Sequence, residues 1–290
     1  MATASQWISG ARPRTLPAAV APVVAGTGAA VFADGEVWWK AVVCLLLSLA
    51  LQVGVNYAND YSDGVRGTDD DRVGPMRLVG SGAASASAVK AAAFGCFAVA
   101  GVLGLLLAAT SGWWLLAVGA VAIAAAWFYT GGDRPYGYRA LGEISVFVFF
   151  GLVAVLGTTY VQVGSFTWPS LAASIGIGAL ACAILVANNL RDIPTDTVSG
   201  KRTLAVVLGD RGTRVLFVVL LVVALGSVVW LASFTAPALL ALLAFPWALR
   251  AATPVGRGAT GLALLPTLRD TGIAELVFAI GAAVGLALGA

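Results

Sequence analysis

The chain has 290 residues, of which 60% are hydrophobic and only 11% are charged, and its mean hydropathy is +0.93. Soluble domains carry roughly 25% charged residues, so this composition excludes an ordinary soluble protein and indicates a membrane protein. The net charge of +3 gives no reason to expect a nucleic-acid partner. The chain has no histidine, so the commonest general base and zinc ligand is missing. Cys44, Cys96 and Cys182 lie inside apolar runs and predict neither a disulfide nor a metal site.

Apolar runs long enough to cross about 30 Å of hydrocarbon recur along the whole chain. The first is expected to be an uncleaved helix and not a signal peptide, because many further spans follow it. We predict an all-α integral membrane protein with nine transmembrane helices around a central cavity that opens to the cytoplasmic side. The spans are residues 16–32, 37–59, 86–109, 113–130, 141–163, 170–190, 214–234, 236–252 and 271–290.

Basic residues give this topology an orientation. If the N-terminus is cytoplasmic, sixteen of the 17 Lys and Arg residues fall on the cytoplasmic side, and only Lys40 is left outside. This agrees with the rule that cytoplasmic loops of membrane proteins are rich in basic residues. The sequence therefore predicts a multi-pass protein of the cell (inner) membrane, with a cytoplasmic N-terminus and an external C-terminus.

The second predicted span ends in a polar stretch that contains Asn56, Asn59, Asp60 and Asp63. If the helix continues to that point, Asn56, Asp60 and Asp63 lie at i, i+4 and i+7 on one face. An amide and two carboxylates at the end of a membrane helix are costly unless a cation lies between them. Mg²⁺ is the natural candidate, because it prefers oxygen ligands and retains water and substrate phosphates.

Residues 188–203 repeat the pattern of residues 56–68. Asn188, Asp192 and Asp196 have the spacing i, i+4 and i+8, and both stretches continue into Gly, basic and Thr residues. The two copies lie 132 residues apart, which indicates an internal duplication in a single domain over residues 1–290. Two carboxylate clusters beside cations suit a diphosphate held by Mg²⁺, because carboxylates bind the metal and basic side chains neutralise the leaving group.

The loop at residues 129–143 carries further candidates. Arg134 could reach a phosphate and Tyr138 could flank an aromatic ring, or both could belong to the belt of Tyr and Arg at a membrane interface. Arg12 and Arg14 are open to the same two interpretations. Asp69, Asp70 and Asp71 are expected to form a solvated loop, although one of the three stays a candidate metal ligand.

These residues resemble the motifs of the UbiA-type intramembrane aromatic prenyltransferase superfamily. The resemblance covers nearly the whole chain and rests on two Asp-rich motifs, Asn56-x₂-Asn59-Asp60-x₂-Asp63 and Asn189-x-Arg191-Asp192-x₃-Asp196-x₃-Gly200-Lys201. Within it, the segments at 11–17, 59–64, 74–82 and 129–143 look most like the branch that uses 1,4-dihydroxy-2-naphthoate. One departure is Gly67, which stands where many members carry a further Asp. Another is Arg77-Leu78-Val79, which replaces the Arg-Pro-Leu run of other branches.

The resemblance implies a Mg²⁺-dependent transfer of a polyprenyl group from an allylic polyprenyl diphosphate to 1,4-dihydroxy-2-naphthoate. The acceptor loses CO₂, and demethylmenaquinone and diphosphate result. The residues implied as metal ligands are Asp60, Asp63, Asp192 and Asp196, with Lys201 as a further catalytic group. The residues implied in substrate binding are Asn56, Asn59, Arg66, Arg134, Tyr138, Asn188, Asn189 and Arg191.

Other interpretations stay open on the sequence alone. The acceptor could be another aromatic compound, such as 4-hydroxybenzoate or homogentisate. An ion-coupled transporter would also carry paired Asn and Asp residues at broken helices, but its site would lie near the midplane. Here only Glu275 is a candidate for a charged residue inside the membrane. The prenyl chain length and the oligomeric state are not determined by these patterns.

Overall fold

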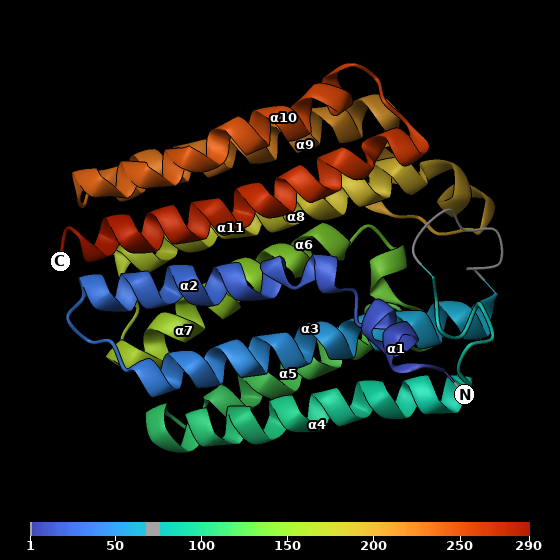
Figure 1. Cartoon of the computed structure of the whole chain (residues 1–290), viewed down its shortest axis with the longest axis horizontal. Helices are drawn as coiled ribbons and strands as arrows, with labels where there is room; N and C mark the ends of the chain where they lie inside the picture. Colours follow the sequence, from blue (N-terminus) through green and yellow to red (C-terminus); the bar gives the residue numbers. More distant parts are fainter. Residues whose placement is uncertain (1, 68–75) are drawn as a thin grey trace.

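A computed structural model describes residues 2–67 and 76–290 of the chain. Every regular element in these two ranges is helical, and the isolated β-type contact is a backbone bridge between Arg139 and Arg202. The expected all-α class is therefore confirmed. The long helices lie side by side in one bundle, with α1 and the C-terminus at opposite ends of it (Figure 1).

The first half of the bundle begins with a short helix that lies across one end (Figure 1). Thr3 caps this helix by accepting a hydrogen bond from the backbone N–H of Gln6. The elements of this half are α1 (Ala4–Gly10), η1 (Pro13–Thr15), α2 (Pro17–Phe32), α3 (Trp38–Arg66), α4 (Ala86–Ser111), α5 (Leu115–Phe128), η2 (Tyr136–Tyr138), α6 (Gly142–Val146), η3 (Phe147–Val153) and α7 (Ala154–Val163). Of these, α6, η3 and α7 form one continuous run whose middle section is π-helical.

The second half contains the most buried helix of the protein. Thr167 starts this helix with a capping box that includes Ser170. The elements are α8 (Trp168–Val198), α9 (Leu204–Ala232), η4 (Ala236–Ala244), α10 (Phe245–Gly256), η5 (Gly261–Leu264) and α11 (Leu265–Ala287). Within α9, Gly209 has a φ of 68°, so a short first turn is set at an angle to the long helix that follows.

Seven of the described helical runs are long and apolar enough to cross a membrane. An eighth is obtained if residues 4–15 and 17–32, which meet at a bend of 49°, form one span. Helix α5 is apolar but has only 14 residues. Each of the nine predicted spans thus coincides with a helical segment, and the chain is a multi-pass membrane protein with seven or eight spans by these criteria.

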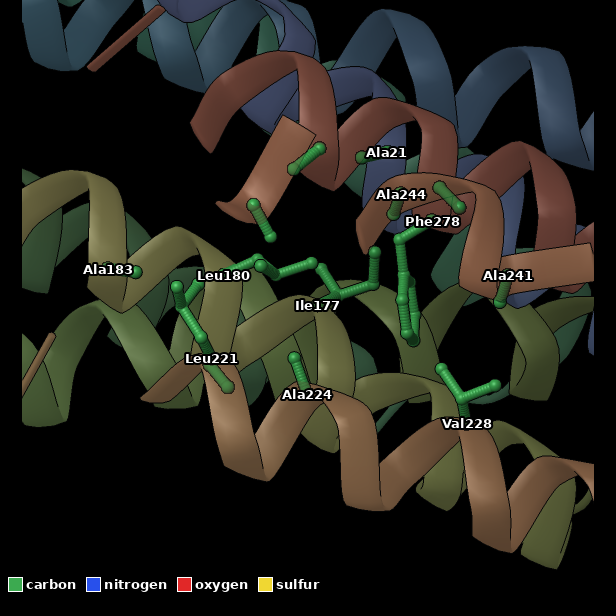
Figure 2. Packing of buried hydrophobic residues seen from close by; sticks show 14 of the residues in the cluster. Ala21, Ile177, Leu180, Ala183, Leu221, Ala224, Val228, Ala241, Ala244 and Phe278 are labelled. Carbon is green, nitrogen blue, oxygen red and sulfur yellow. The ribbon is translucent and has the colours of Figure 1, made fainter. Parts of the chain in front are cut away.

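The main hydrophobic cluster lies between α8, α9 and α11. Figure 2 shows Ile177 and Leu180 of α8 beside Leu221 of α9 and Phe278 of α11, with small alanines filling the spaces between the helices. Small residues allow membrane helices to approach closely, and packing replaces the missing hydrophobic drive between helices in lipid. This cluster gives α8 a rigid support, and the other face of α8 is left to line a cavity.

Candidate active site

A cavity of about 2360 Å³ runs through the described part of the bundle. Its walls come from α2, α3, α5, α7, α8, α11 and the π-helical section, and they are mostly apolar. Polar and charged residues gather at one end, where α3 and α8 finish. The cavity therefore offers a polar head site joined to a long apolar slot.

Helix α3 contributes one continuous face to this cavity. The lining residues run from Cys44 through Gln52, Asn56 and Asn59 to Asp63 and recur every three or four positions. Cys44 and Asp63 are nineteen positions apart, which corresponds to about 28 Å at the rise of an α-helix. The helix is apolar along most of this length and polar in its last two turns, so the sequence of α3 places the head site at one end of the slot.

Asp63 is the centre of charge in the head site. Lys201 Nζ lies 3.4 Å from its Oδ1, and Arg77 Nη2 lies 3.6 Å from its Oδ2. The Tyr138 hydroxyl donates a hydrogen bond to Oδ1, and the Tyr138 ring lies 4.7 Å below Lys201 Nζ. Burial, with Asp63 adding to it, raises the pKa of Tyr138 well above its ordinary range, so this hydroxyl stays a donor. Two cationic side chains thus lie beside a buried carboxylate in the head site.

Helix α8 contributes the opposing polar face. Arg191 donates two hydrogen bonds of 2.6 Å to Asp192, and its guanidinium also donates to Asn188 Oδ1 at 2.9 Å. One turn further on, Asp196 accepts a hydrogen bond of 3.5 Å from the Thr203 hydroxyl. Asn188, Arg191, Asp192 and Asp196 all line the cavity. The structure therefore brings the two predicted motifs to the same cavity.

Two connecting segments close the head site. The backbone N–H of Arg202 donates to the Tyr138 carbonyl at 3.0 Å, so the loop after α8 is joined to the loop before α6. Arg66 donates to the backbone carbonyls of Thr130 and Gly132, and Thr130 donates to Asn59 Oδ1 at 2.8 Å. Arg66 is therefore used to hold the 129–138 segment against α3.

Three predicted site residues lie elsewhere. Arg134 is exposed, and neither Arg134 nor Arg66 is among the described residues that line the cavity. Asp60 is almost fully buried, and its two oxygens accept hydrogen bonds from the backbone N–H groups of Leu78 and Val79. The candidate ligands Asp69, Asp70 and Asp71 lie outside the described residues.

The structure also adds residues that the site prediction did not include. Arg77 and Thr15 line the head site, and Thr15 accepts a hydrogen bond of 3.0 Å from Asn56. Glu143 is buried and accepts a hydrogen bond of 3.0 Å from Asn189 Nδ2. The motifs that contain Thr15, Arg77 and Glu143 were part of the resemblance to a family. No pattern in the sequence, however, indicated that Arg77 faces Asp63.

The residues that line the cavity can also be paired in a second register. The lining residues Asn59, Asp63 and Gly67 pair with Asn188, Asp192 and Asp196, at a constant offset of 129 residues. Gly67 ends α3 with a φ of 69°, where a left-handed conformation favours glycine. The first half thus lacks the third side chain that the second half has.

The oxygen donors of the head site fit a hard divalent cation. Among residues 2–67 and 76–290, no group of three Asp, Glu, Cys or His side chains is close enough to hold a metal without other ligands. The available donors are carboxylate and amide oxygens, which suit Mg²⁺ when water and phosphate oxygens complete its shell. A metal here would therefore bind together with an anionic substrate.

Comparisons with known proteins show which family the chain belongs to. The UbiA prenyltransferase family matches residues 19–257. A 1,4-dihydroxy-2-naphthoate octaprenyltransferase of Mycobacterium tuberculosis is 57% identical over 290 residues, which cover 100% of this chain and 99% of that protein. The protein of the same description from Escherichia coli is 36% identical over 299 residues, covering 95% of this chain and 94% of that one.

Solved structures share the fold. A UbiA homolog from Aeropyrum pernix matches with a TM-score of 0.71 at 16% identity, covering 93% of this chain and 97% of that one. A UbiA homolog from Archaeoglobus fulgidus bound to GPP and Mg²⁺ matches with a TM-score of 0.70 at 16% identity, over 97% and 99% of the two chains. Because the family match spans most of the chain and full-length relatives agree with it, this chain belongs to the UbiA prenyltransferase family.

Proposed function

We propose that the protein transfers a polyprenyl group from an allylic polyprenyl diphosphate to 1,4-dihydroxy-2-naphthoate in menaquinone synthesis. The single observation that carries this proposal is the joining of a cation-rich head site around Asp63 to an apolar slot of membrane length. A diphosphate fits the first part and a prenyl chain fits the second. The names of the full-length relatives supply the naphthoate acceptor.

The proposed reaction balances as follows. The allylic C–O bond breaks with its electron pair leaving on the diphosphate, and the ring carbon that carries the carboxylate of the acceptor forms the new C–C bond. The carboxylate is lost as CO₂, and its bonding electrons restore the aromatic ring. The products are diphosphate, CO₂ and the quinol form of demethylmenaquinone.

Asp63, Asp192 and Asp196 are proposed to hold Mg²⁺, with Asn59 and Asn188 beside them. Bound Mg²⁺ would supply positive charge at the bridging diphosphate oxygens. Lys201 and Arg77, which face Asp63 in this structure, would turn to the phosphate oxygens and offset the charge that grows on them. Asn56 donates hydrogen bonds to the Ala11 carbonyl and to the Thr15 hydroxyl, on either side of Arg12 and Arg14 at the cavity wall. We propose that these two arginines bind the acceptor carboxylate.

The apolar slot excludes water from the allylic cation. Phe149 and Phe150 of the π-helical section line it, and aromatic faces stabilise nearby positive charge. A carbocation that met water would be hydrolysed, so a dry wall protects the transfer. This role agrees with the frequent occurrence of π-helical turns at functional sites.

We also propose nine crossings of the cell membrane, with the head site opening to the cytoplasm, the N-terminus inside and the C-terminus outside. The distribution of basic residues supports this orientation. The opposite ends that α1 and the C-terminus occupy in Figure 1 are consistent with an odd number of crossings. Helix α5 would then be a short ninth span.

The test is prenyl transfer by the purified protein, with 1,4-dihydroxy-2-naphthoate and an allylic polyprenyl diphosphate, in the presence of Mg²⁺ or of a chelator. Product and CO₂ are expected only with Mg²⁺. Asp63→Asn and Asp192→Asn are each expected to lower kcat/KM by about 10²–10³, the range for removal of one electrostatic contact to a transition state. Normal turnover by both variants, or faster turnover with 4-hydroxybenzoate or homogentisate, would contradict the proposal.

A further inference from the structure

The Asp60 carboxylate is used by the backbone of a neighbouring segment. Its Oδ2 accepts from the N–H of Leu78 at 2.8 Å, and its Oδ1 accepts from the N–H of Val79 at 2.9 Å. The residue is 1% exposed and, unlike Asn59 and Asp63, is not among the residues that line the cavity. Each carboxylate oxygen of Asp60 therefore already has a hydrogen-bond partner in the protein.

The segment that Asp60 holds is closely fitted to its surroundings. Leu78 is fully buried, and a Cβ at Gly10 would lie 2.6 Å from its Cδ1. A Cβ at Gly64, one turn after Asp60, would lie 2.5 Å from Val79 Cγ1 and 2.6 Å from its Cβ. Only glycine at position 64 allows Val79 to approach this closely. Two hydrogen bonds and two glycine contacts thus fix the backbone of residues 78 and 79.

Arg77 directly precedes this fixed pair and lines the head site. Its guanidinium lies 3.6 Å from Asp63, and the Arg77 side chain is 10% exposed. Arginine carries a planar group with several donors, which suits it to bind phosphate oxygens in pairs. Because the next two residues are held on α3, the Arg77 backbone has little freedom to move its side chain away.

The second half of the repeat supports the same interpretation. At the offset of 129 residues, Asp60 corresponds to Asn189. Asn189 is also buried and donates its side-chain N–H to Glu143 of α6, a neighbouring segment. The position is thus used in both halves to hold an adjacent element, and in the second half it carries no charge.

We infer that Asp60 is a positioning residue, which holds Leu78 and Val79 so that Arg77 grips the diphosphate of the donor, and that it is not a ligand of Mg²⁺. The inference rests on the proposed function for the identity of the anion. Of the two carboxylates Asp60 and Asp63 in α3, only Asp63 is then a metal ligand.

The experiment compares Asp60→Asn, Asp63→Asn and Arg77→Gln in the prenyl transfer assay, with Mg²⁺ and donor titrated separately. Asp60→Asn and Arg77→Gln are each expected to raise the KM for the donor by roughly tenfold or more, as for loss of a hydrogen bond to a charged group. The half-saturating Mg²⁺ concentration should rise only in Asp63→Asn. The double variant of Asp60 and Arg77 should be no worse than Arg77→Gln, because both changes remove one function.

A binding measurement separates this inference from the proposed function. Mn²⁺ bound in the presence of inorganic pyrophosphate is counted by electron paramagnetic resonance. Mn²⁺ affinity at saturating pyrophosphate should be retained in Asp60→Asn and lost in Asp63→Asn, even if no prenyl transfer occurs. The inference would be overturned if Asp60→Asn and Asp63→Asn lost Mn²⁺ affinity equally. It would also be overturned if the increases in donor KM caused by Asp60→Asn and Arg77→Gln multiplied in the double variant.

Gly64→Ala tests the positioning role without changing any charge. It should raise the donor KM as Asp60→Asn does, and Val79→Gly in the same chain should restore it by removing the clash. Gly95→Ala is the matched control, because a Cβ at Gly95 on α4 meets no atom within 4 Å. If Gly64→Ala is folded and has the donor KM of the parent protein, the segment does not position Arg77 and the inference fails.

Discussion

At the scale of single residues, the head site depends on how the charge of Asp63 is balanced. A buried carboxylate is costly unless it is paired and hydrogen-bonded. Asp63 has Lys201 and Arg77 as cations and the Tyr138 hydroxyl as a donor. The Tyr138 ring also lies beneath Lys201, so one side chain touches both members of the pair.

Tyr138→Phe separates these two roles, because it keeps the ring and removes the hydroxyl. The loss of a hydrogen bond to a charged group costs about 1.5–3 kcal/mol, so kcat/KM should fall roughly 10- to 100-fold. The measurement is steady-state prenyl transfer. Tyr61→Phe is the control, because Tyr61 stacks on Trp127 outside the cavity lining and should keep the parent activity. An unchanged kcat/KM in Tyr138→Phe would show that the hydroxyl does not contribute.

The raised pKa of Tyr138 gives a stability difference that depends on pH. Burial keeps the phenol neutral in the folded protein, whereas the unfolded chain ionises near its ordinary pKa of about 10. This contribution is fully present below that pH and is lost as the pH rises through the folded pKa. Thermal unfolding at pH 7, 9 and 10.5 should therefore show the parent protein losing its advantage over Tyr138→Phe only at the highest pH. An advantage that already falls between pH 7 and 9 would contradict this assignment.

At the scale of helices, Lys40 of α3 forms hydrogen bonds with α4 and α7 at the end of the bundle opposite the head site. Its Nζ donates to the Val161 carbonyl at 2.7 Å, to Ser111 Oγ at 2.9 Å and to the Thr110 carbonyl at 3.3 Å. The last carbonyl groups of an α-helix have no partner inside the helix, and a cation at that end also interacts favourably with the helix dipole. This arrangement explains the basic residue that does not follow the charge bias of the chain.

Lys40→Met should destabilise the protein by about 1.5 kcal/mol, since carbonyl groups lose a charged donor. The donor KM should not change, because Lys40 is outside the cavity lining. The measurement is thermal unfolding in detergent, together with the transfer assay. Lys90→Met is the control, since among the described residues Lys90 is exposed and contacts the rings of Tyr61 and Trp127, which is worth about 0.5–1 kcal/mol. A larger loss of stability in Lys90→Met than in Lys40→Met would contradict this role of Lys40.

The sequence predicted where the helices lie better than where two of them end. Apolar length placed a helical segment at every expected span, but α3 continues to Arg66 and α8 to Val198, seven or eight residues beyond the predicted ends. Hydropathy ends a span at the first polar residues. Here those residues are kept helical by tertiary partners, such as the hydrogen bonds of Asp60 with the segment after α3.

The candidate site was predicted in composition and only partly in geometry. Asn59, Asp63, Asn188, Asp192, Asp196 and Lys201 meet at the cavity. The offset of 132 residues matched like residue types, whereas an offset of 129 also pairs residues that line the cavity. The rotation of α3 about its axis decides which of its side chains face inward. That rotation is set by packing between helices, and spacing within one helix does not reveal it.

At the scale of the whole molecule, the cavity joins residues from both ends of the bundle. Trp114 and Phe166 line it at one end and Asp63 lines it at the other. The slot is built from side chains of several helices, and its length along α3 is about 28 Å. Wall residues far from the reacting atoms would therefore contact a donor chain that fills this slot and affect which chain lengths bind.

Leu47→Trp should narrow the far part of the slot. Long-chain donors should lose roughly tenfold or more in kcat/KM, since a core that receives extra bulk loses about 1–3 kcal/mol. Geranyl diphosphate should react as before, because a short chain does not reach Leu47. The adjacent Leu46 is 49% exposed and outside the lining, so Leu46→Trp is the matched control. Equal losses with short and long donors would show that Leu47 does not border the slot.

The pairing of Asp63 with Lys201 also has a consequence for biosynthesis. The two residues are 138 positions apart in the chain. At a synthesis rate of about 5–20 residues per second, Lys201 emerges roughly 7–28 s after Asp63. During this interval the end of α3 carries a carboxylate that lacks one of its cations. The contact between Asp63 and Lys201 can therefore form only after most of the second half has been synthesised.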